Sequence, residues 1–186
     1  FDNTVTSVKQ LPINYYNVTT LHDVIPLIYP DDYLSTSIKN WYLEKIEYTK
    51  RCDLVFTVSE FSKKKIIEHL NIPPEKVIVA YNAVNTETFN TVPNQAYKKY
   101  ITSDTSYILY VGGIDKHKNI RSLLKSFQLF NKDQEHNFKI VFSGNLNQEQ
   151  VNYIYDLAYS HNIEKKSILF TGYVDDLTLA SLYQNC

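Results

Sequence analysis

Short apolar runs alternate along this chain with segments whose apolar residues recur at helical spacing. The run Leu54–Val58 is continuous in apolar character, as expected for a strand buried on both faces. Repeated strand–helix units of this length predict parallel strands with right-handed crossovers, and hence an α/β, Rossmann-like fold. The predicted strands cover residues 18–21, 54–58, 77–80, 107–111, 138–142 and 167–170, and helices are predicted over 37–50, 59–70, 120–127, 151–158 and from about 175 onward.

The alternation breaks once, over residues 84–105, where polar residues and turn formers replace the periodic pattern. Such a stretch is typical of a linker between domains. We therefore expect parts of two Rossmann-like domains, over 1–85 and 106–186, joined by a linker over 86–105. Each predicted sheet has few strands, so both domains are expected to be incomplete. In the first, Pro26 and Pro30 predict a rigid loop after the first strand.

Only four glycines occur in the 186 residues, and each lies just past a strand-like run. Average usage would give about 13 glycines in a chain of this length. A glycine between a strand and a helix lets backbone N–H groups approach a ligand, and the carboxyl edge of an open α/β sheet is where ligands bind. The pattern favours a ligand edge built by Gly112, Gly113, Gly144 and Gly172; simple turn glycines are the alternative.

The segment 112–119, Gly-Gly-Ile-Asp-Lys-His-Lys-Asn, is the strongest local motif. It combines glycine backbone, cationic side chains and the start of a helix, which together suit a phosphate group. It matches neither the dinucleotide fingerprint nor the Walker pattern. A solvated basic turn at Lys116, His117 and Lys118 is the alternative interpretation.

Composition narrows the remaining function classes. The 19 basic and 20 acidic residues nearly cancel, so bulk charge offers no case for binding nucleic acid. The sequence contains no apolar run near the ~20 residues of a membrane span. Its Cys and His spacings suit no metal site, so no metal or cofactor is expected. His22 and Asp23 follow a strand and can act on a proton or a sugar hydroxyl, although such pairs are more often structural.

Five segments in a fixed order resemble glycosyltransferase family 4, the retaining nucleotide-sugar transferases of the two-domain GT-B type. The resemblance spans roughly residues 12–186. The segments are His22-Asp23 followed by Pro26-Leu27; Val58–Lys63 with Ile72–Val77; Tyr81–Asn85; Tyr110–Gly113 with Lys118-Asn119; and Phe170–Val174 with Leu177 to Tyr183.

The resemblance implies a role for each candidate residue. Lys118 and Asn119 would lie at the donor diphosphate, and Gly112 and Gly113 would approach it by backbone. The nucleotide base would lie beside residues of the next two strand ends, namely Gly144, Gly172 and Val174. In the first domain, His22 would be catalytic and would face the sugar or acceptor. Asp23 and Ser59 would lie at the edge of the cleft.

The implied reaction is transfer of a hexose, with retention, from a GDP- or UDP-sugar to a glycan or lipid-linked acceptor. Mannose from GDP-mannose is the first candidate, in surface polysaccharide biosynthesis. The resemblance implies a cytoplasmic protein, associated peripherally with the inner face of the plasma membrane, and no nucleic-acid partner.

Two other interpretations remain open, and departures from the family pattern favour the first of them, a non-catalytic module. Gly113 and His117 stand where many members carry arginine, and Ala83 replaces a glycine. The chain opens on Phe1 and lacks methionine, so we expect a segment of a longer product. The family's glutamate pair would fall beyond Cys186, so the segment alone is expected not to turn over. The alternatives are a non-catalytic scaffold module and a nucleotide-sugar epimerase.

Overall fold

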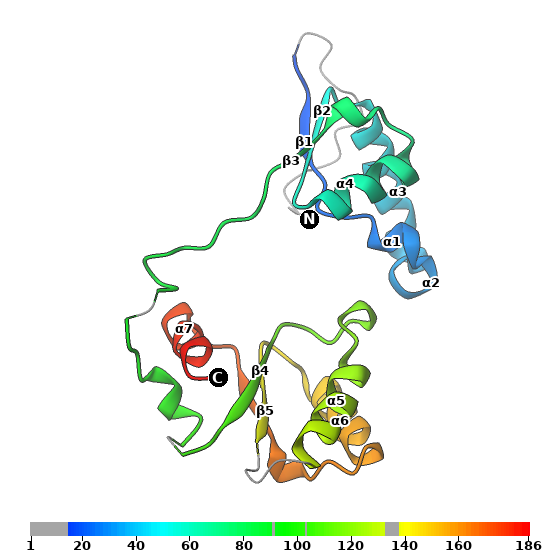
Figure 1. Ribbon diagram of the computed structural model, residues 1–186. Helices are drawn as coiled ribbons and strands as arrows, with labels where there is room; N and C mark the ends of the chain where they lie inside the picture. The colour runs from blue at the N-terminus through cyan, green and yellow to red at the C-terminus, as the bar shows by residue number, and fades with distance from the viewer. Residues whose placement is uncertain (1–14, 91, 103, 133–137) are drawn as a thin grey trace. The chain divides into compact units, whose positions relative to one another are not determined.

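The computed structural model describes residues 15–90, 92–102, 104–132 and 138–186 (Figure 1). The chain divides into two compact units, Phe1–Ala83 and Val84–Cys186. Each unit contains a three-stranded parallel sheet with flanking helices, which confirms the predicted α/β class.

The first unit is built on a sheet with the order β1-β2-β3. Its strands are β1 (Val18–Thr20), β2 (Leu54–Thr57) and β3 (Val77–Val79), and its helices are α1 (Ile25–Ile28), α2 (Pro30–Tyr33), α3 (Thr36–Arg51), α4 (Glu60–Leu70) and the short 3₁₀ turn η1 (Pro74–Lys76). Val55 of the central strand, Ile46 of α3 and Ile66 of α4 are buried in one apolar cluster. Burial of such side chains contributes about 1.5–3 kcal/mol each, so this cluster holds the sheet and helices together.

The loop predicted over Pro26–Pro30 was wrong. The segment forms α1 and α2, two helices of one turn each. Pro26 and Pro30 lie in the first turn of these helices, where the fixed φ of proline suits helix geometry and its missing N–H costs nothing.

The second unit has the sheet order β4-β5-β6. Its elements are β4 (Tyr107–Val111), α5 (Ile120–Lys132), β5 (Lys139–Ser143), α6 (Gln148–Ser160), β6 (Ile168–Gly172) and α7 (Asp176–Gln184), with 3₁₀ turns η2 (Ala96–Lys99), η3 (Lys116–Lys118) and η4 (Lys165–Ser167). Alternate residues of the central strand face opposite sides: Ile140 and Phe142 join the cluster with α5 and α6, and Val141 joins the cluster with α7. Helices therefore cover both faces of this sheet (Figure 1).

Part of the predicted linker packs into the second unit. The Asn94 side-chain amide donates to the Leu177 carbonyl at 2.8 Å, and the Tyr97 N–H donates to the Ser181 hydroxyl at 3.1 Å. Tyr97 and Ile101 are buried with α7. The segment is polar overall and lacks periodicity, so its two anchoring apolar residues carried no signal in the sequence.

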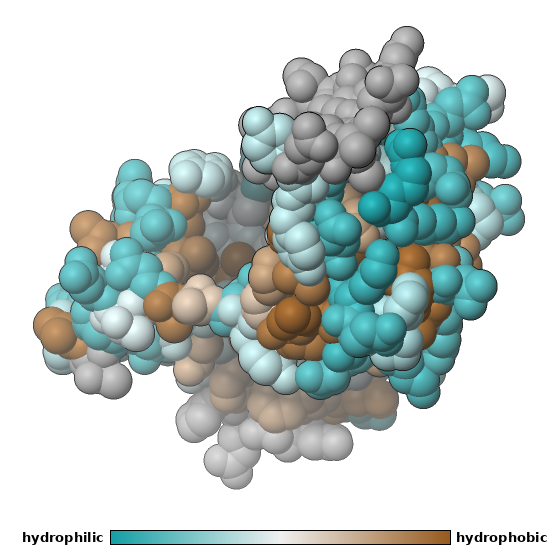
Figure 2. Space-filling model, turned by 90° about the horizontal axis from the view of Figure 1, so that it is seen from above, coloured by the Kyte–Doolittle hydropathy of each residue, from teal (hydrophilic) through white to brown (hydrophobic). Residues whose placement is uncertain are grey.

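Surface apolar residues are scattered on the face drawn in Figure 2, where they lie among hydrophilic ones. Among the described residues, we find no helix with the length and apolar character required to cross a bilayer.

Candidate functional site

Three glycines meet at the carboxyl edge of the second sheet. The Gly112 N–H donates to the Ser143 carbonyl at 3.0 Å, and the Gly144 N–H donates to the Gly172 carbonyl at 3.1 Å. All three glycines have positive φ, at 125°, 153° and 69° in chain order. A Cβ on Gly144 would lie 3.0 Å from the Gly112 carbonyl oxygen, so only glycine fits there without a shift. The predicted grouping of these strand ends is thus present.

The loop between β4 and α5 carries backbone donors and cations together. Gly113 is exposed, and its N–H and that of Ile114 have no acceptor among the described residues. The following turn places Lys118 in solvent, with its own N–H bonded to the Asp115 carbonyl at 2.8 Å. Unpaired N–H groups beside a lysine can bind an anionic oxygen. The loop can therefore receive a phosphate by backbone and side chain.

Asn119 has a local structural role. Its φ of 52° places it in the left-handed region, and its carbonyl accepts the first hydrogen bonds of α5, from Ser122 and Leu123. Its side-chain oxygen lies 3.4 Å from the Ser122 N–H. Asparagine tolerates this conformation better than most residues. Asn119 therefore redirects the chain from the loop into the helix.

Tyr110 was missed by the sequence reasoning. Its ring packs against Phe142 with centroids 5.4 Å apart, and its hydroxyl donates to the Gly113 carbonyl. Burial, with the Asp115 carboxylate as a second cause, raises the pKa of Tyr110. The 16 tyrosines of the chain suggested compositional bias, which hid this one. Its position next to a strand end was the available signal.

Beyond β6, the chain turns into α7. Val174 is partly buried and packs against the cluster that contains Leu182, so its side chain faces the core. Asp175 caps α7, accepting the Thr178 N–H at 2.7 Å. This hydrogen bond lowers the pKa of Asp175. Gly172 is exposed at the end of β6, and its carbonyl accepts the Gly144 N–H.

In the first unit, the polar residues at strand ends are tied into local structure. Asp23 accepts the Ile25 N–H at 2.9 Å, and Ser59 caps α4 by accepting the Ser62 N–H at 3.0 Å. The helix predicted over 59–70 is confirmed as α4, with Ser59 as its N-cap. His22 is exposed just after β1.

A buried hydroxyl holds the main chain at this histidine. Thr57 of β2 is fully buried, and its hydroxyl donates to the His22 carbonyl at 3.2 Å. This contact joins residues 35 positions apart, so no local pattern in the sequence indicates it.

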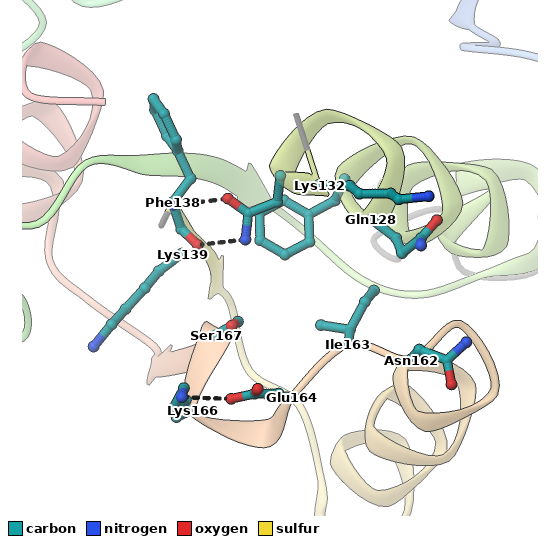
Figure 3. A pocket seen from close by; sticks show the side chains of 11 residues that line it. Gln128, Lys132, Phe138, Lys139, Asn162, Ile163, Glu164, Lys166 and Ser167 are labelled. Atoms are coloured by element: carbon teal, nitrogen blue, oxygen red, sulfur yellow. Dashed lines mark hydrogen bonds and ion pairs between the residues drawn. The ribbon is translucent and has the colours of Figure 1, made fainter. Parts of the chain in front are cut away.

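A cavity of about 400 Å³ lies at the opposite edge of the second sheet, where β5 and β6 begin (Figure 3). Lys132, Lys139 and Lys166 line it, and Lys166 pairs with Glu164 at 2.6 Å. This cavity lies at the opposite end of the strands from the glycine edge. Among residues 15–90, 92–102, 104–132 and 138–186, no three His, Cys, Asp or Glu side chains gather as metal ligands.

Two family sequence models match the chain. The model described as Glycosyl transferases group 1 matches residues 93–186, half of the chain. The model described as Glycosyltransferase Family 4 matches residues 12–88.

Two Escherichia coli proteins named as mannosyltransferases are similar to this chain. The chain is 25% identical over 190 residues to the Serotype-specific mannosyltransferase WbdA of Escherichia coli, covering 100% of this chain and 23% of the relative. It is 28% identical over 171 residues to the O-antigen chain mannosyltransferase B of Escherichia coli, covering 89% of this chain and 44% of the relative. The chain thus spans less than half the length of either relative.

Among solved structures, Anabaena Alr3699/HepE in complex with UDP-glucose matches with a TM-score of 0.66 and 18% identity, over 91% of this chain and 44% of that one. At this identity the likeness concerns the fold, which supports the GT-B type. With its second unit matched by the group 1 model and its first by the family 4 model, the chain belongs to the group 1 glycosyl transferases.

Proposed function

We propose that this chain forms part of a glycosyltransferase that moves a hexose, with retention, from a nucleotide sugar to a glycan or lipid-linked acceptor. The observation that carries the proposal is the glycine edge of the second unit, where the unpaired N–H groups of Gly113 and Ile114 neighbour Lys118. A sugar diphosphate presents the anionic oxygens that such donors bind.

Each proposed contact uses a different part of that edge. Lys118 neutralises charge on the diphosphate, Asn119 shapes the loop, and Gly112 and Gly113 allow close approach of the backbone. The main chain at Gly144, Gly172 and Val174 borders the nucleotide base. As the bond from sugar to phosphate breaks, charge grows on the departing diphosphate, and preoriented N–H groups and lysine stabilise it. The acceptor attacks on the same face.

In the first unit, we propose that His22 acts at the transferred sugar or the acceptor. It is exposed, and Thr57 holds its main chain, so its imidazole is free to meet a ligand from a fixed backbone. Asp23 shapes the chain just after His22, and Ser59 shapes the chain after β2, each through a local hydrogen bond.

The first candidate donor is GDP-mannose, since the two Escherichia coli relatives are named as mannosyltransferases. A UDP-sugar is the second candidate, since the HepE structure holds UDP-glucose. The O-antigen relatives support a role in surface polysaccharide synthesis, which would place the protein in the cytoplasm at the inner face of the plasma membrane.

Because the chain spans 23% of WbdA, donor binding is the property that this chain itself can test. GDP and UDP are titrated by calorimetry into the chain and into Lys118→Ala. We expect the substitution to weaken diphosphate binding about tenfold, as for loss of a charge-assisted contact. Lys125→Ala, at an exposed lysine of α5, is the matched control and should bind as the unaltered chain does. Equal affinity of Lys118→Ala and Lys125→Ala would overturn the phosphate role.

A non-catalytic scaffold module is the second candidate. It is favoured by Gly113 and Ala83, which replace residues that the family pattern leads us to expect. A scaffold without a donor site should bind neither GDP nor UDP in the same titration.

A further inference from the structure

The chain after β4 contains two adjacent glycines, and a hydroxyl contact restrains the second of them. Gly112 and Gly113 together give this loop wide backbone freedom. Gly112 is held by its hydrogen bond to the Ser143 carbonyl, and Gly113 by the Tyr110 hydroxyl on its carbonyl. The exposed Gly113 has no other hydrogen bond among the described residues. Tyr110 therefore sets the orientation of the next peptide.

We propose that Tyr110 is a positioning residue for the donor diphosphate. The peptide between Gly113 and Ile114 is trans, so its C=O and N–H point in opposite directions. With the carbonyl held by Tyr110, the Ile114 N–H is aimed away from the tyrosine and left open to an anionic oxygen. The contact also keeps a carbonyl oxygen from turning toward the phosphates, where it would repel them. This inference rests on the proposed donor site.

The tyrosine is itself held in place by an aromatic ladder across the sheet. Tyr110 pairs in register with Phe142, and Phe142 with Phe170. Their ring centroids are 5.4 Å apart at both steps. Rings on three neighbouring strands leave Tyr110 little freedom to swing, and such support is what a precise site requires. Burial raises the pKa of Tyr110 above its ordinary value of about 10, so its hydroxyl remains a donor well above neutral pH.

A second tyrosine on the same strand provides a matched control. Tyr107 lies three residues earlier on the opposite face, and its hydroxyl donates to the Leu182 carbonyl of α7 at 2.7 Å. Tyr107→Phe and Tyr110→Phe each remove one hydroxyl that donates to a backbone carbonyl and keep the ring. The two variants differ in the carbonyl that loses its donor: Tyr110 bonds a carbonyl of the loop after β4, and Tyr107 bonds a carbonyl of α7.

GDP and guanosine are titrated into the unaltered chain and into three variants, Tyr110→Phe, Tyr107→Phe and Lys118→Ala, and NMR monitors binding. Thermal melts measure the stability of each variant. We expect Tyr110→Phe to weaken GDP binding about three- to tenfold and to leave guanosine binding unchanged. Tyr107→Phe should lower the melting temperature and leave the affinity for both ligands unchanged. A role confined to packing would weaken GDP and guanosine equally, or neither.

The outcomes separate this inference from the proposed function. If Lys118→Ala weakens GDP binding and Tyr110→Phe does not, the donor site stands and the positioning role is overturned. Equal loss of GDP and guanosine affinity in Tyr110→Phe also overturns it. If the unaltered chain binds guanosine and GDP with the same affinity, there is no phosphate site, and both proposals fail.

Discussion

The carboxyl edges of the two sheets are built in contrasting ways. In the first unit, the strand ends carry polar side chains, and Asp23 and Ser59 are used for turns and caps. In the second unit, the edge is formed by Gly112, Gly144 and Gly172, and backbone groups are exposed beside it. The polar side chains of the first edge thus make hydrogen bonds within their own fold, whereas backbone N–H groups beside the second edge have no acceptor among the described residues. Because its backbone donors are open, we expect the second unit to be the one that binds a charged ligand.

One device is common to both edges. A hydroxyl from the sheet donates to a carbonyl just past a strand: Thr57 to His22 in the first unit, and Tyr110 to Gly113 in the second. Each hydroxyl restrains a main-chain segment that carries a candidate ligand-binding group. Four substitutions test how the two edges differ.

The largest effect is expected from Gly144→Ala, which tests whether the second edge depends on glycine geometry. Its Cβ would lie 3.0 Å from the Gly112 carbonyl oxygen at a φ of 153°. Strain and overpacking together should destabilise the second unit by about 2–4 kcal/mol. Urea denaturation followed by circular dichroism measures this. Gly113→Ala, where φ is not positive and the nearest atom is the Asp115 side chain at 3.3 Å, is the control and should cost under about 0.5 kcal/mol. Equal stability of the two variants would contradict the prediction.

Next in size is Thr57→Val, which tests the hydroxyl contact in the first unit. The substitution keeps the buried shape and leaves the His22 carbonyl without its donor, so we expect a loss of about 1–2 kcal/mol. Trp41, the single tryptophan, lies in α3 of this unit, so its fluorescence in urea reports the unit's unfolding. Thr57→Ser keeps a hydroxyl and should recover part of the loss. If valine is as stable as threonine, the contact is dispensable.

A smaller gain is expected from Gly113→Arg, which adds charge to the open edge. Gly113 has no positive φ, so a side chain is tolerated there, and the guanidinium would meet the diphosphate. We expect calorimetry to show GDP binding about threefold to tenfold tighter, as for one added charge-assisted contact. Gly113→Gln, of similar length without charge, is the control. Unchanged affinity in both variants would place the diphosphate elsewhere.

The smallest effect concerns the helix caps, which differ in charge between the units. The hydrogen bond from Thr178 lowers the pKa of Asp175 in the folded chain below its unfolded value of about 3.9. The Asp175 cap therefore stabilises the fold above that unfolded pKa, and the stabilisation is lost as the pH falls through the folded pKa. Ser59 does not titrate, so the cap on α4 should be insensitive to acid. Melting temperatures measured from neutral pH into acid should show a difference between the unaltered chain and Asp175→Asn that shrinks in acid. A difference independent of pH would contradict this.

Elements governed by neighbouring residues were predictable. The cap of Ser59 and the helix that it starts follow from side chains three residues apart, because an N-cap uses only local hydrogen bonds. The strand-end glycines were found for the same reason. The short helices at Pro26 and Pro30 were missed because proline suits both a loop and a first helical turn. The packing of Tyr97 depends on α7, more than 80 positions away.

From the sequence alone came the order of strands and helices, the glycines at the strand ends, and a loop that joins glycine to lysine. These follow from local periodicity and backbone preference, which neighbouring residues determine. Only the tertiary structure decided that Gly144 faces the Gly112 carbonyl, that Thr57 holds His22, and that Tyr110 holds Gly113 from within an aromatic ladder. The physical reason is register: contacts between strands depend on which residues the sheet aligns, and spacing along one strand does not determine that alignment.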